Sequence, residues 1–436
     1  MIILCGLCVL GGEQQMKWDV IVVGGGASGL MAAGRAAELG AQVLLLEKMG
    51  RAGVKLGLTG KGRCNLTNSG DLPSFIERYR HNGKFLYNAF SRFFHDDLTA
   101  FFNARGLPTV EERGKRIFPR SNRAQDVVRV LQQYALGNGV SLKLCVRVRE
   151  ILAPNQQVQG VLTDRGPFEA ERVVLATGGA SYPETGSSGD GYEMAKRLGH
   201  TICPIRPSLV PLKVRESWVR NLQGLSLKNV RVKLLEGGKT VAEDFGEMLF
   251  THFGVSGPII LSLSGLAVER MESERLELTI DFKPALLREQ VEKRLIREIQ
   301  KENRKFIRTV LSRFLPQKII PIFLQRAGIA FDLRGAEMRI RERKSLVGLM
   351  KDFRLTLQGA RPLEEAVVTA GGISVKEINP YTMESKIIHG LFFCGEVIDV
   401  DGVSGGYNLQ AAFSTGRAAG EAAGFHRGAR RERREE

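Results

Sequence analysis

Cysteine is scarce in this sequence, with six residues among 436, at positions 5, 8, 64, 145, 203 and 394. So few and so scattered cysteines do not make a disulfide framework, which fits a reducing compartment, and the cytoplasm is the expected location. Cys5 and Cys8 form a CxxC pair, but zinc usually needs four ligands and no second Cys or His pair lies near them. No metal site is therefore predicted.

Long apolar runs are also lacking. Residues 253–268 carry no charged side chain, but they are fewer than the ~20 apolar residues that span a bilayer, so no membrane partner is expected. The apolar residues 1–10 have no preceding cation and no small-residue cleavage site, which argues against a signal peptide. We expect translation to start at Met16, and residues 1–15 and 427–436 to be disordered.

Acidic residues are outnumbered, with 47 Asp and Glu against 63 Lys and Arg, which gives a formal net charge of +16. The excess is uneven: residues 286–354 hold 18 basic and 8 acidic residues, and residues 113–129 hold six basic residues against Asp126 alone. Localised positive charge attracts polyanions such as nucleic acid or anionic lipid, but a solvated helical face has the same composition. Charge alone leaves both interpretations open.

Residues 18–47 have the pattern of a strand, a helix and a second strand. An apolar run rich in Val at 18–23 predicts a buried parallel strand, small residues to about Leu39 predict a helix, and residues 42–46 predict another strand. The motif GxGxxG lies at the first strand-to-helix turn, and Glu47 follows its last glycine by 18 positions. This combination is typical of a dinucleotide-binding unit.

Each glycine has a separate physical role in such a unit. Gly24 permits the tight turn, Gly26 lets the backbone approach a pyrophosphate, and Gly29 lets the helix pack closely on the sheet. The N-terminus of the helix favours the diphosphate, and Glu47 can accept hydrogen bonds from a ribose. FAD and NAD share this unit, so the rest of the chain must decide between them.

Two later segments favour FAD. A buried strand at 172–176 runs into Thr-Gly-Gly, as in many two-segment FAD domains, and a strand at 390–394 ends just before Glu396. A helix over about 405–424 would begin under the flavin ring, where its dipole stabilises negative charge on the reduced ring. The sequence has no second strand, GxGxxG and helix in succession, so NAD(P)H as electron donor would dock transiently.

The middle of the chain has a different pattern. Residues 202–282 alternate apolar and polar residues with many β-branched side chains, which predicts an antiparallel β-domain. From Leu286 to about Phe314 apolar residues recur close to helical spacing with a basic opposite face, which predicts a helix. Further short helices are expected as far as Phe353.

Several motifs resemble those of one family. They are residues 24–29, 57–68 (GLTGKGRCNLTN), 116–121 (RIFPRS), 176–183 (ATGGASYP), 250–258 (FTHFGVSGP) and 405–410 (GGYNLQ). On these residues the chain resembles the BaiN/RdsA-type, or YhiN-like, FAD-dependent oxidoreductases over nearly its whole length after Met16. Thr59 stands where serine is expected more often, and it keeps the hydroxyl.

The resemblance implies an α/β fold in which a Rossmann-like FAD-binding domain is interrupted by an antiparallel β-barrel domain that carries a helical insert. The expected boundaries are 16–200 and 368–426 for the FAD-binding domain, 201–284 and 355–367 for the barrel, and 285–354 for the basic insert. Activities attached to the family are reduction of uridine to dihydrouridine in large-subunit ribosomal RNA, reduction of steroid enones and oxidation of small amines.

We expect an enzyme that reduces the C=C bond of uridine in ribosomal RNA or its precursor, with electrons from NAD(P)H. The alternative is a small-molecule flavin oxidoreductase that acts on an enone or an amine. A disulfide reductase is not expected, because no CxxxxC or usable CxxC lies near the glycine motif.

The loop at 57–68 combines glycines, cations, Cys64 and Asn65, which suit contact with phosphate or reduced flavin. Glu396 is expected near the ribityl or diphosphate groups, although spacing does not separate it from Asp399 and Asp401. The residues expected to bind the cofactor are Gly24, Gly26, Ala27, Ser28, Gly29, Glu47, Lys48, Thr59, Gly60, Gly62, Arg63, Cys64, Asn65, Ala176, Thr177, Gly178, Gly395, Glu396, Gly406, Tyr407, Asn408 and Leu409.

Reduction of an activated C=C bond needs an acid to protonate the carbon that does not receive hydride. Cys64 is a catalytic candidate, with packing beside the flavin as the other interpretation, and its neighbour Arg63 would lower the thiol pKa. His252, in a Gly-rich stretch, is a second candidate, although a lone His is more often structural. Tyr182 and Tyr407 could shield the ring, stack on a base or belong to the core.

Overall fold

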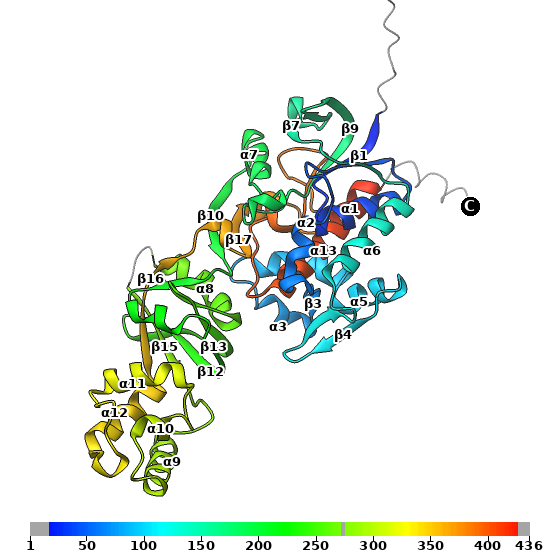
Figure 1. Cartoon of the computed structure of the whole chain (residues 1–436). Coiled ribbons are helices and arrows are strands. Elements are labelled where there is room, and N and C mark those ends of the chain that lie inside the picture. The colour runs from blue at the N-terminus through cyan, green and yellow to red at the C-terminus, as the bar shows by residue number, and fades with distance from the viewer. Residues whose placement is uncertain (1–16, 272–274, 426–436) are drawn as a thin grey trace, which may run out of the picture.

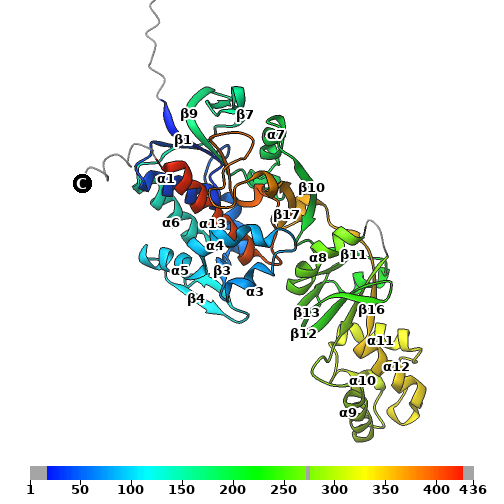
Figure 2. The ribbon, with the colours of Figure 1, turned by 180° about the vertical axis from the view of Figure 1, so that it is seen from behind.

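The computed structural model describes residues 17–271 and 275–425. The expected start at Met16, the CxxC pair and the expected disordered ends at 1–15 and 427–436 lie outside the described residues. Figures 1 and 2 show an elongated molecule: a large α/β body holds both ends of the described chain, a β-structure follows, and a group of helices forms the far end.

A seven-stranded sheet forms the centre of the α/β body. Its strands run in the order β6 (Ser141–Lys143), β2 (Val43–Leu46), β1 (Trp18–Val23), β9 (Gly166–Leu175), β8 (Gly160–Thr163) and β7 (Val148–Leu152), and β18 (Leu391–Phe393) also pairs with β9. Strand β1 pairs in parallel with β2 and β9, so Ile21 lies opposite Leu44 on one side and Val173 on the other. A strand paired on both sides favours Val and Ile, and Ile21 is fully buried.

Two helices from opposite ends of the chain pack against each other beside this sheet. Helix α1 (Ala27–Glu38) follows the glycine motif, and helix α13 (Gly405–Gly424) lies beside it in both views. A Cβ atom on Gly416 would lie 2.4 Å from the carbonyl oxygen of Ser28, and one on Gly420 would lie 2.3 Å from that of Ala32. Glycine is therefore required where the two backbones meet. Both helices, and the strands β1, β2, β9 and β18, confirm the elements predicted there.

Shorter elements complete the α/β body. They are α2 (Val54–Leu58), β3 (Thr67–Asn68), α3 (Leu72–Ile76), α4 (Tyr87–Arg92), α5 (His95–Ala104), β4 (Thr109–Glu112), β5 (Arg116–Pro119), α6 (Ala124–Gly137) and α7 (Asp190–Arg197). Strands β3, β5 and β4 form a small antiparallel sheet, and α6 packs on α1.

Two antiparallel strands, β10 (Ile202–Ser208) and β17 (Val368–Ile373), connect the α/β body to the β-structure. That structure is a closed barrel of six strands: β11 (Leu212–Val214), β14 (Gly254–Ser256), β13 (Lys239–Phe250), β12 (Ser226–Glu236), β15 (Leu276–Asp281) and β16 (Phe353–Ala360). Its paired strands are antiparallel, and helix α8 (Pro258–Arg270) packs against β13.

Between β15 and β16 the chain forms four α-helices, α9 (Arg288–Lys301), α10 (Ile307–Leu311), α11 (Ile320–Ala327) and α12 (Ile340–Lys351). We call residues 285–354 the basic insert. The helix predicted from Leu286 to about Phe314 is wrong as one element, because α9 ends at Lys301 and α10 begins at Ile307. Backbone hydrogen bonds explain the break: the Ile307 amide donates to Leu333 and the Gly335 amide donates to Lys305, both at 2.9 Å. These bonds satisfy backbone groups that a continuous helix would use internally.

The core has two buried apolar clusters. One lies in the α/β body, and the other joins the barrel to the basic insert through residues such as Phe282, Phe323 and Phe353. The rings of Phe323 and Phe353 stack with centroids 4.9 Å apart, which couples α11 to the start of β16. Of the helices within residues 17–271 and 275–425, none is both long enough and apolar enough to cross a membrane.

Candidate cofactor cavity and its surroundings

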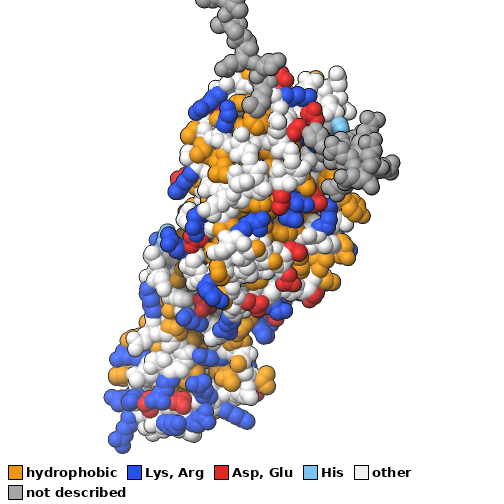
Figure 3. Space-filling model, turned by 90° about the vertical axis from the view of Figure 1, so that its right-hand side faces the viewer, with side chains coloured by type: hydrophobic (Ala, Val, Ile, Leu, Met, Phe, Trp, Pro, Cys, Tyr) orange, Lys and Arg blue, Asp and Glu red, His pale blue; other side chains and the backbone are white. Residues whose placement is uncertain are grey.

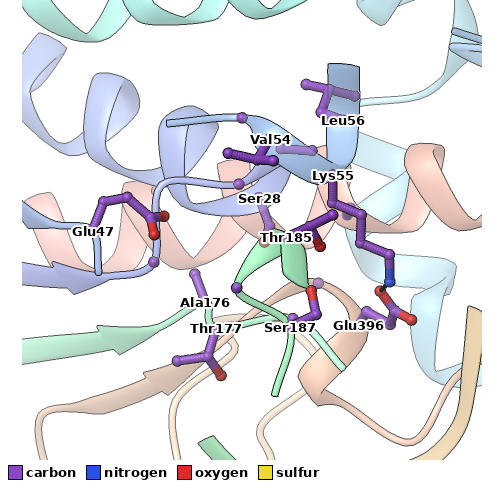
Figure 4. Close-up of a pocket in the computed structure, with 18 of the residues that line it drawn as sticks. Ser28, Glu47, Val54, Lys55, Leu56, Ala176, Thr177, Thr185, Ser187 and Glu396 are labelled. Atoms are coloured by element: carbon purple, nitrogen blue, oxygen red, sulfur yellow. Dashed lines mark hydrogen bonds and ion pairs between the residues drawn. The ribbon is translucent and has the colours of Figure 1, made fainter. Parts of the chain in front are cut away.

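A cavity opens at the carboxyl ends of the parallel strands of the α/β body. It encloses about 1330 Å³ of empty space, its mouth included. The turn after β1, the end of β2, helix α2, the end of β9, the loop before α7 and the start of α13 all contribute to its walls (Figure 4). Ligands of doubly wound α/β folds bind at this edge of the sheet, so the cavity is the candidate cofactor site.

Two helix N-termini meet the cavity. Helix α1 begins after Gly26 and helix α13 after Ser404, and neither of these two residues caps its helix with its own side chain. Neither helix has an acidic residue in its first turn. The first backbone amides of a helix lack intrahelical partners and carry the positive end of its dipole. The cavity is therefore suited to an anionic ligand at two separate places.

The glycine motif fixes the geometry of the first of these N-termini. Gly24 has φ +105°, and a Cβ atom there would lie 2.5 Å from the carbonyl oxygen of Ala176. A Cβ on Gly29 would lie 1.9 Å from the carbonyl oxygen of Gly24, whereas a Cβ on Gly26 would meet no atom within 4 Å. Gly24 and Gly29 thus allow the helix and the strands to pack, and Gly26 leaves the cavity open beside the helix.

Glu47 stabilises the same turn through hydrogen bonds to the backbone. Its carboxylate accepts hydrogen bonds from the Gly25 amide at 2.7 Å and from the Met49 amide at 2.8 Å. Burial is the largest influence on this carboxyl group and raises its pKa, while the two amide bonds oppose the rise. A carboxylate has about four acceptor sites, so Glu47 retains capacity for a ribose hydroxyl.

Lys55 and Glu396 form an ion pair across the cavity, although 341 positions separate them in sequence. Lys55 Nζ lies 2.7 Å from Glu396 Oε2 and donates to Ser181 Oγ at 2.7 Å. The Thr369 amide donates to the other carboxylate oxygen at 2.8 Å. The pair joins α2 to the turn after β18, and the bond from the Thr369 amide links this turn to β17, the strand that returns from the barrel.

The structure also decides which of the acids Glu396, Asp399 and Asp401 lies at this cavity. Asp401 forms a buried ion pair with Arg80, and Asp399 accepts a hydrogen bond from Asn82 at 2.9 Å. Both aspartates line a second cavity, near β10, rather than the first. Of these three acids, Glu396 is the one placed at the candidate cofactor site.

Two buried polar atoms in the cavity wall have no hydrogen-bond partner among the described residues. They are Thr177 Oγ1 and Asp190 Oδ1. The other Asp190 oxygen lies 2.6 Å from Lys48 Nζ. An unpaired buried hydroxyl or carboxylate oxygen is costly, so both atoms fit a site whose ligand supplies hydroxyl or amine groups. Together with the two helix N-termini, they fit a dinucleotide.

Many of the residues predicted to bind the cofactor lie at this cavity. Those that line it are Gly24, Gly26, Ala27, Ser28, Glu47, Lys48, Thr59, Gly60, Ala176, Thr177, Gly178, Gly395, Glu396, Asn408 and Leu409. Those that do not line it are Gly29, Gly62, Arg63, Cys64, Asn65, Gly406 and Tyr407.

Asn65 does not line the cavity, but it contacts the first turn of helix α13. With its amide turned to satisfy its neighbours, the side-chain oxygen accepts from the Gly406 amide at 3.2 Å and the nitrogen donates to the Thr67 carbonyl at 2.9 Å. Asn65 therefore positions the first turn of α13. Tyr407 belongs to an aromatic cluster, with its ring 4.5 Å from that of Phe75 between centroids.

Cys64 is fully buried, and its backbone has φ +60°, which is uncommon for a residue with a side chain. Burial raises the pKa of its thiol to about 12, and a hydrogen bond with Thr59 opposes the rise. The predicted lowering of this pKa by Arg63 is wrong, because the Arg63 guanidinium pairs with Glu112 and lies over the ring of Phe118 at 4.3 Å. The thiol therefore stays neutral at physiological pH.

The remaining candidates lie outside the cavity. His252 is exposed in the turn between β13 and β14 of the barrel. Tyr182 is 39% exposed and stands at the surface of the α/β body. Neither side chain lines the cavity in the described structure.

The sequence prediction missed several cavity residues. Among them are Gly53, Val54, Lys55, Leu56, Val146, Val148, Thr185, Gly186, Ser187, Asp190, Met194, Val367 and Val368. One sequence signal was available for the first group: a glycine at 53 lies shortly before the loop at 57–68, and in the structure it has φ +73° and precedes the first residue of α2. The valines at 367 and 368 come from the strand that returns from the barrel and have no local signal.

Comparisons with known proteins agree on one family. Residues 18–422 match the family described as HI0933-like protein Rossmann domain. The chain is similar to a 3-dehydro-bile acid delta(4,6)-reductase of Clostridium scindens, with 35% identity over 92% of this chain and 98% of the relative. It is also similar to a ribosomal RNA dihydrouridine synthase of Escherichia coli strain K12, with 30% identity over 92% of this chain and 96% of the relative.

One solved structure extends the comparison of folds. The 3-ketosteroid-delta4-(5alpha)-dehydrogenase from Rhodococcus jostii RHA1 aligns with a TM-score of 0.51 at 16% identity, covering 96% of this chain and 99% of that one. At this identity the similarity concerns the fold alone.

Proposed function

The chain belongs to the family of HI0933-like proteins with a Rossmann domain, as its motifs predicted, and we propose that it is an FAD-dependent reductase of a carbon–carbon double bond. The family is one of FAD-dependent oxidoreductases. Similarity over most of the chain therefore supports both the cofactor and the reaction class. The choice of substrate and electron donor is a finer proposal and rests on particular surfaces.

Bound FAD would supply hydride chemistry at the flavin, and the described residues suit each part of the cofactor. Gly26 and the first amides of α1 would hold the diphosphate, and Glu47 would accept from a ribose. The start of α13 would face the flavin ring, with Asn65 holding that helix in place. We take residues 16–200 and 368–426 as the FAD-binding domain on this basis, with 201–284 and 355–367 as the barrel.

We propose uridine in large-subunit ribosomal RNA as the substrate. The observation that carries this choice is the basic insert, with 18 basic against 8 acidic residues, at the end of the molecule away from the cavity (Figures 1 and 3). A small substrate in the cavity would not reach that surface, whereas RNA phosphates could contact it while one base is held elsewhere. The similarity to the dihydrouridine synthase of Escherichia coli supports the same choice.

The reaction also needs a proton and a donor of electrons. We propose Cys64 as the source of the proton for the carbon that receives no hydride. Its neutral thiol is fully buried and does not line the cavity, so the proton would pass through the hydroxyl of Thr59, which hydrogen-bonds with the thiol and does line the cavity. NAD(P)H is the proposed donor of electrons and would dock transiently, because the sequence has a single strand–GxGxxG–helix unit.

Anaerobic reoxidation of the reduced flavoprotein tests this proposal. The purified protein should be yellow and release intact FAD on denaturation. After reduction with dithionite, a uridine-containing fragment of large-subunit ribosomal RNA should reoxidise the flavin and gain one dihydrouridine per flavin. RNA binding should weaken with salt, with a slope of log affinity near −4 for about six phosphate contacts at roughly −0.7 each. A colourless protein that cannot be reconstituted with FAD would refute the proposal.

The second candidate is reduction of a small enone. It is favoured by the 35% identity to the bile acid reductase, which covers 98% of that relative. The same assay decides: reoxidation by a steroid enone at a rate insensitive to salt, with no reaction on RNA, would establish the small-molecule enzyme. Reaction on an amine, with the flavin reduced rather than oxidised, would establish the third family activity.

A further inference from the structure

A cluster of aromatic and cationic side chains lies on the basic insert, where the chain turns between helices. The Arg308 guanidinium lies over two phenyl rings, 4.5 Å from the centroid of Phe331 and 4.6 Å from that of Phe306. Arg334 lies over the Phe306 ring at 5.4 Å and donates to the Arg304 carbonyl at 2.9 Å. We call Phe306, Arg308, Phe331 and Arg334 the stacking cluster.

The two chain segments of the stacking cluster are held together by backbone bonds. Residues 306 and 334 form an antiparallel bridge, flanked by the backbone hydrogen bonds that join residues 305 and 307 to residues 335 and 333. The break between α9 and α10 therefore has a structural consequence, because it brings Phe306 and Arg308 next to Phe331 and Arg334. A continuous helix would not place these four side chains on one surface.

Phe331 is 51% exposed although the Arg308 guanidinium lies over its ring. Arg304, Lys305 and Arg334 are also exposed, and Figure 3 shows Lys and Arg side chains gathered at this end of the molecule. Acidic neighbours are few: Glu302 pairs with Lys305 and Arg313, Glu337 accepts from the Arg334 amide, and Asp332 is exposed. The surface thus combines a partly open ring face with an excess of positive charge.

We infer that the stacking cluster binds an unpaired nucleotide of RNA, with its base stacked on Phe331 and the adjacent phosphates held by Arg334 and Arg304. Aromatic rings stack on the faces of bases, and single-stranded RNA is bound through such rings within basic surfaces. Arg308 holds the ring from one side, so its orientation is set before binding. A lipid surface fits less well, because Phe331 is flanked in the chain by Ala330 and the exposed Asp332 rather than by large apolar residues that could insert with it.

This inference rests on the proposed RNA substrate and adds to it a second contact, remote from the cavity. It also explains how the substrate could be positioned: a base held at the basic insert fixes the RNA while another base enters the cavity. The cluster takes no part in hydride or proton transfer.

The test compares three variants in the FAD-loaded protein. Phe331→Ala removes the ring, Phe331→Trp keeps a stacking surface, and Ile340→Ala removes another exposed apolar side chain of the insert, 62% exposed, outside the cluster. Binding is measured by fluorescence anisotropy with a labelled single-stranded RNA and, in competition, with inorganic polyphosphate, which has charge but no bases. We expect Phe331→Ala to weaken RNA binding by roughly 5- to 100-fold, the range for loss of one stacked base, and to leave polyphosphate binding unchanged.

Phe331→Trp and Ile340→Ala should bind RNA within about twofold of the wild type. Equal RNA binding by Phe331→Ala and the wild type would overturn the stacking cluster while leaving the proposed substrate intact. A wild-type protein that binds no RNA under these conditions would instead refute the proposed substrate, and the cluster with it. An equal loss of RNA and polyphosphate binding in Phe331→Ala would show a purely electrostatic or folding effect and would also overturn the cluster.

Discussion

Gly26→Ala should leave the apoprotein as stable as the wild type and lower its affinity for FAD by roughly 10- to 100-fold, because the new methyl group occupies the space of close approach to the diphosphate. Gly26 has φ −81°, which alanine adopts without strain, and its Cβ would meet no protein atom within 4 Å. Thermal unfolding of the apoprotein and titration with FAD, followed by quenching of flavin fluorescence, measure the two effects separately.

Gly29→Ala is the matched control. Its Cβ would lie 1.9 Å from the carbonyl oxygen of Gly24, so the protein itself must distort and the apoprotein should lose stability. If Gly26→Ala bound FAD as tightly as the wild type, the diphosphate would not lie at the N-terminus of α1. If both variants unfolded equally early, Gly26 would have a packing role that the structure does not indicate.

Cys64→Ala should retain FAD and lose C=C reduction by about 10²- to 10⁴-fold, the usual contribution of a positioned general acid. The pKa of the thiol is raised to about 12, so the donor remains protonated throughout the range in which an ordinary thiol would ionise. Turnover of the wild type should therefore show no alkaline loss attributable to this thiol until the pH approaches 12. The measurement is single-turnover flavin reoxidation by substrate across pH, with FAD content determined for each sample.

Cys145→Ala provides the control for loss of a thiol, because Cys145 is exposed and lies outside the cavity. It should turn over like the wild type. Full turnover by Cys64→Ala would remove Cys64 from the proton-transfer step and move that role to His252 or to water. Loss of FAD from Cys64→Ala would assign Cys64 to packing beside the cofactor, its other interpretation.

The parts of the fold that were predictable are those set by local pattern. The strand at 18–23, the glycine turn and the helix after Gly405 each have a sequence signal within about 20 residues, and all three form as predicted. Their role at one cavity followed from the known position of such motifs in α/β sheets. The same reasoning assigned separate packing and approach roles to Gly29 and Gly26, which the contacts of each glycine agree with.

Contacts between distant segments were not predictable. The ion pair of Lys55 with Glu396 joins residues 341 positions apart, and only the fold separates Glu396 from Asp399 and Asp401. The break in the helix near Glu302 was missed because apolar spacing continues through it, while the backbone bonds that cause it come from residues 333–335. The thiol pKa of Cys64 was misjudged because burial, which a sequence does not display, raises it, and because the neighbouring Arg63 pairs with Glu112 instead.

Nucleoside mass spectrometry of large-subunit ribosomal RNA decides whether this protein makes a dihydrouridine there. RNA from cells that lack this protein would be compared with RNA from cells that carry the wild type, Gly26→Ala, or a form with the charges of residues 286–354 reversed. We expect one dihydrouridine to disappear on deletion, to return with the wild type, and to fail to return in full with either altered form. An unchanged dihydrouridine content on deletion, together with salt-insensitive turnover of a small enone by the pure protein, would contradict this expectation.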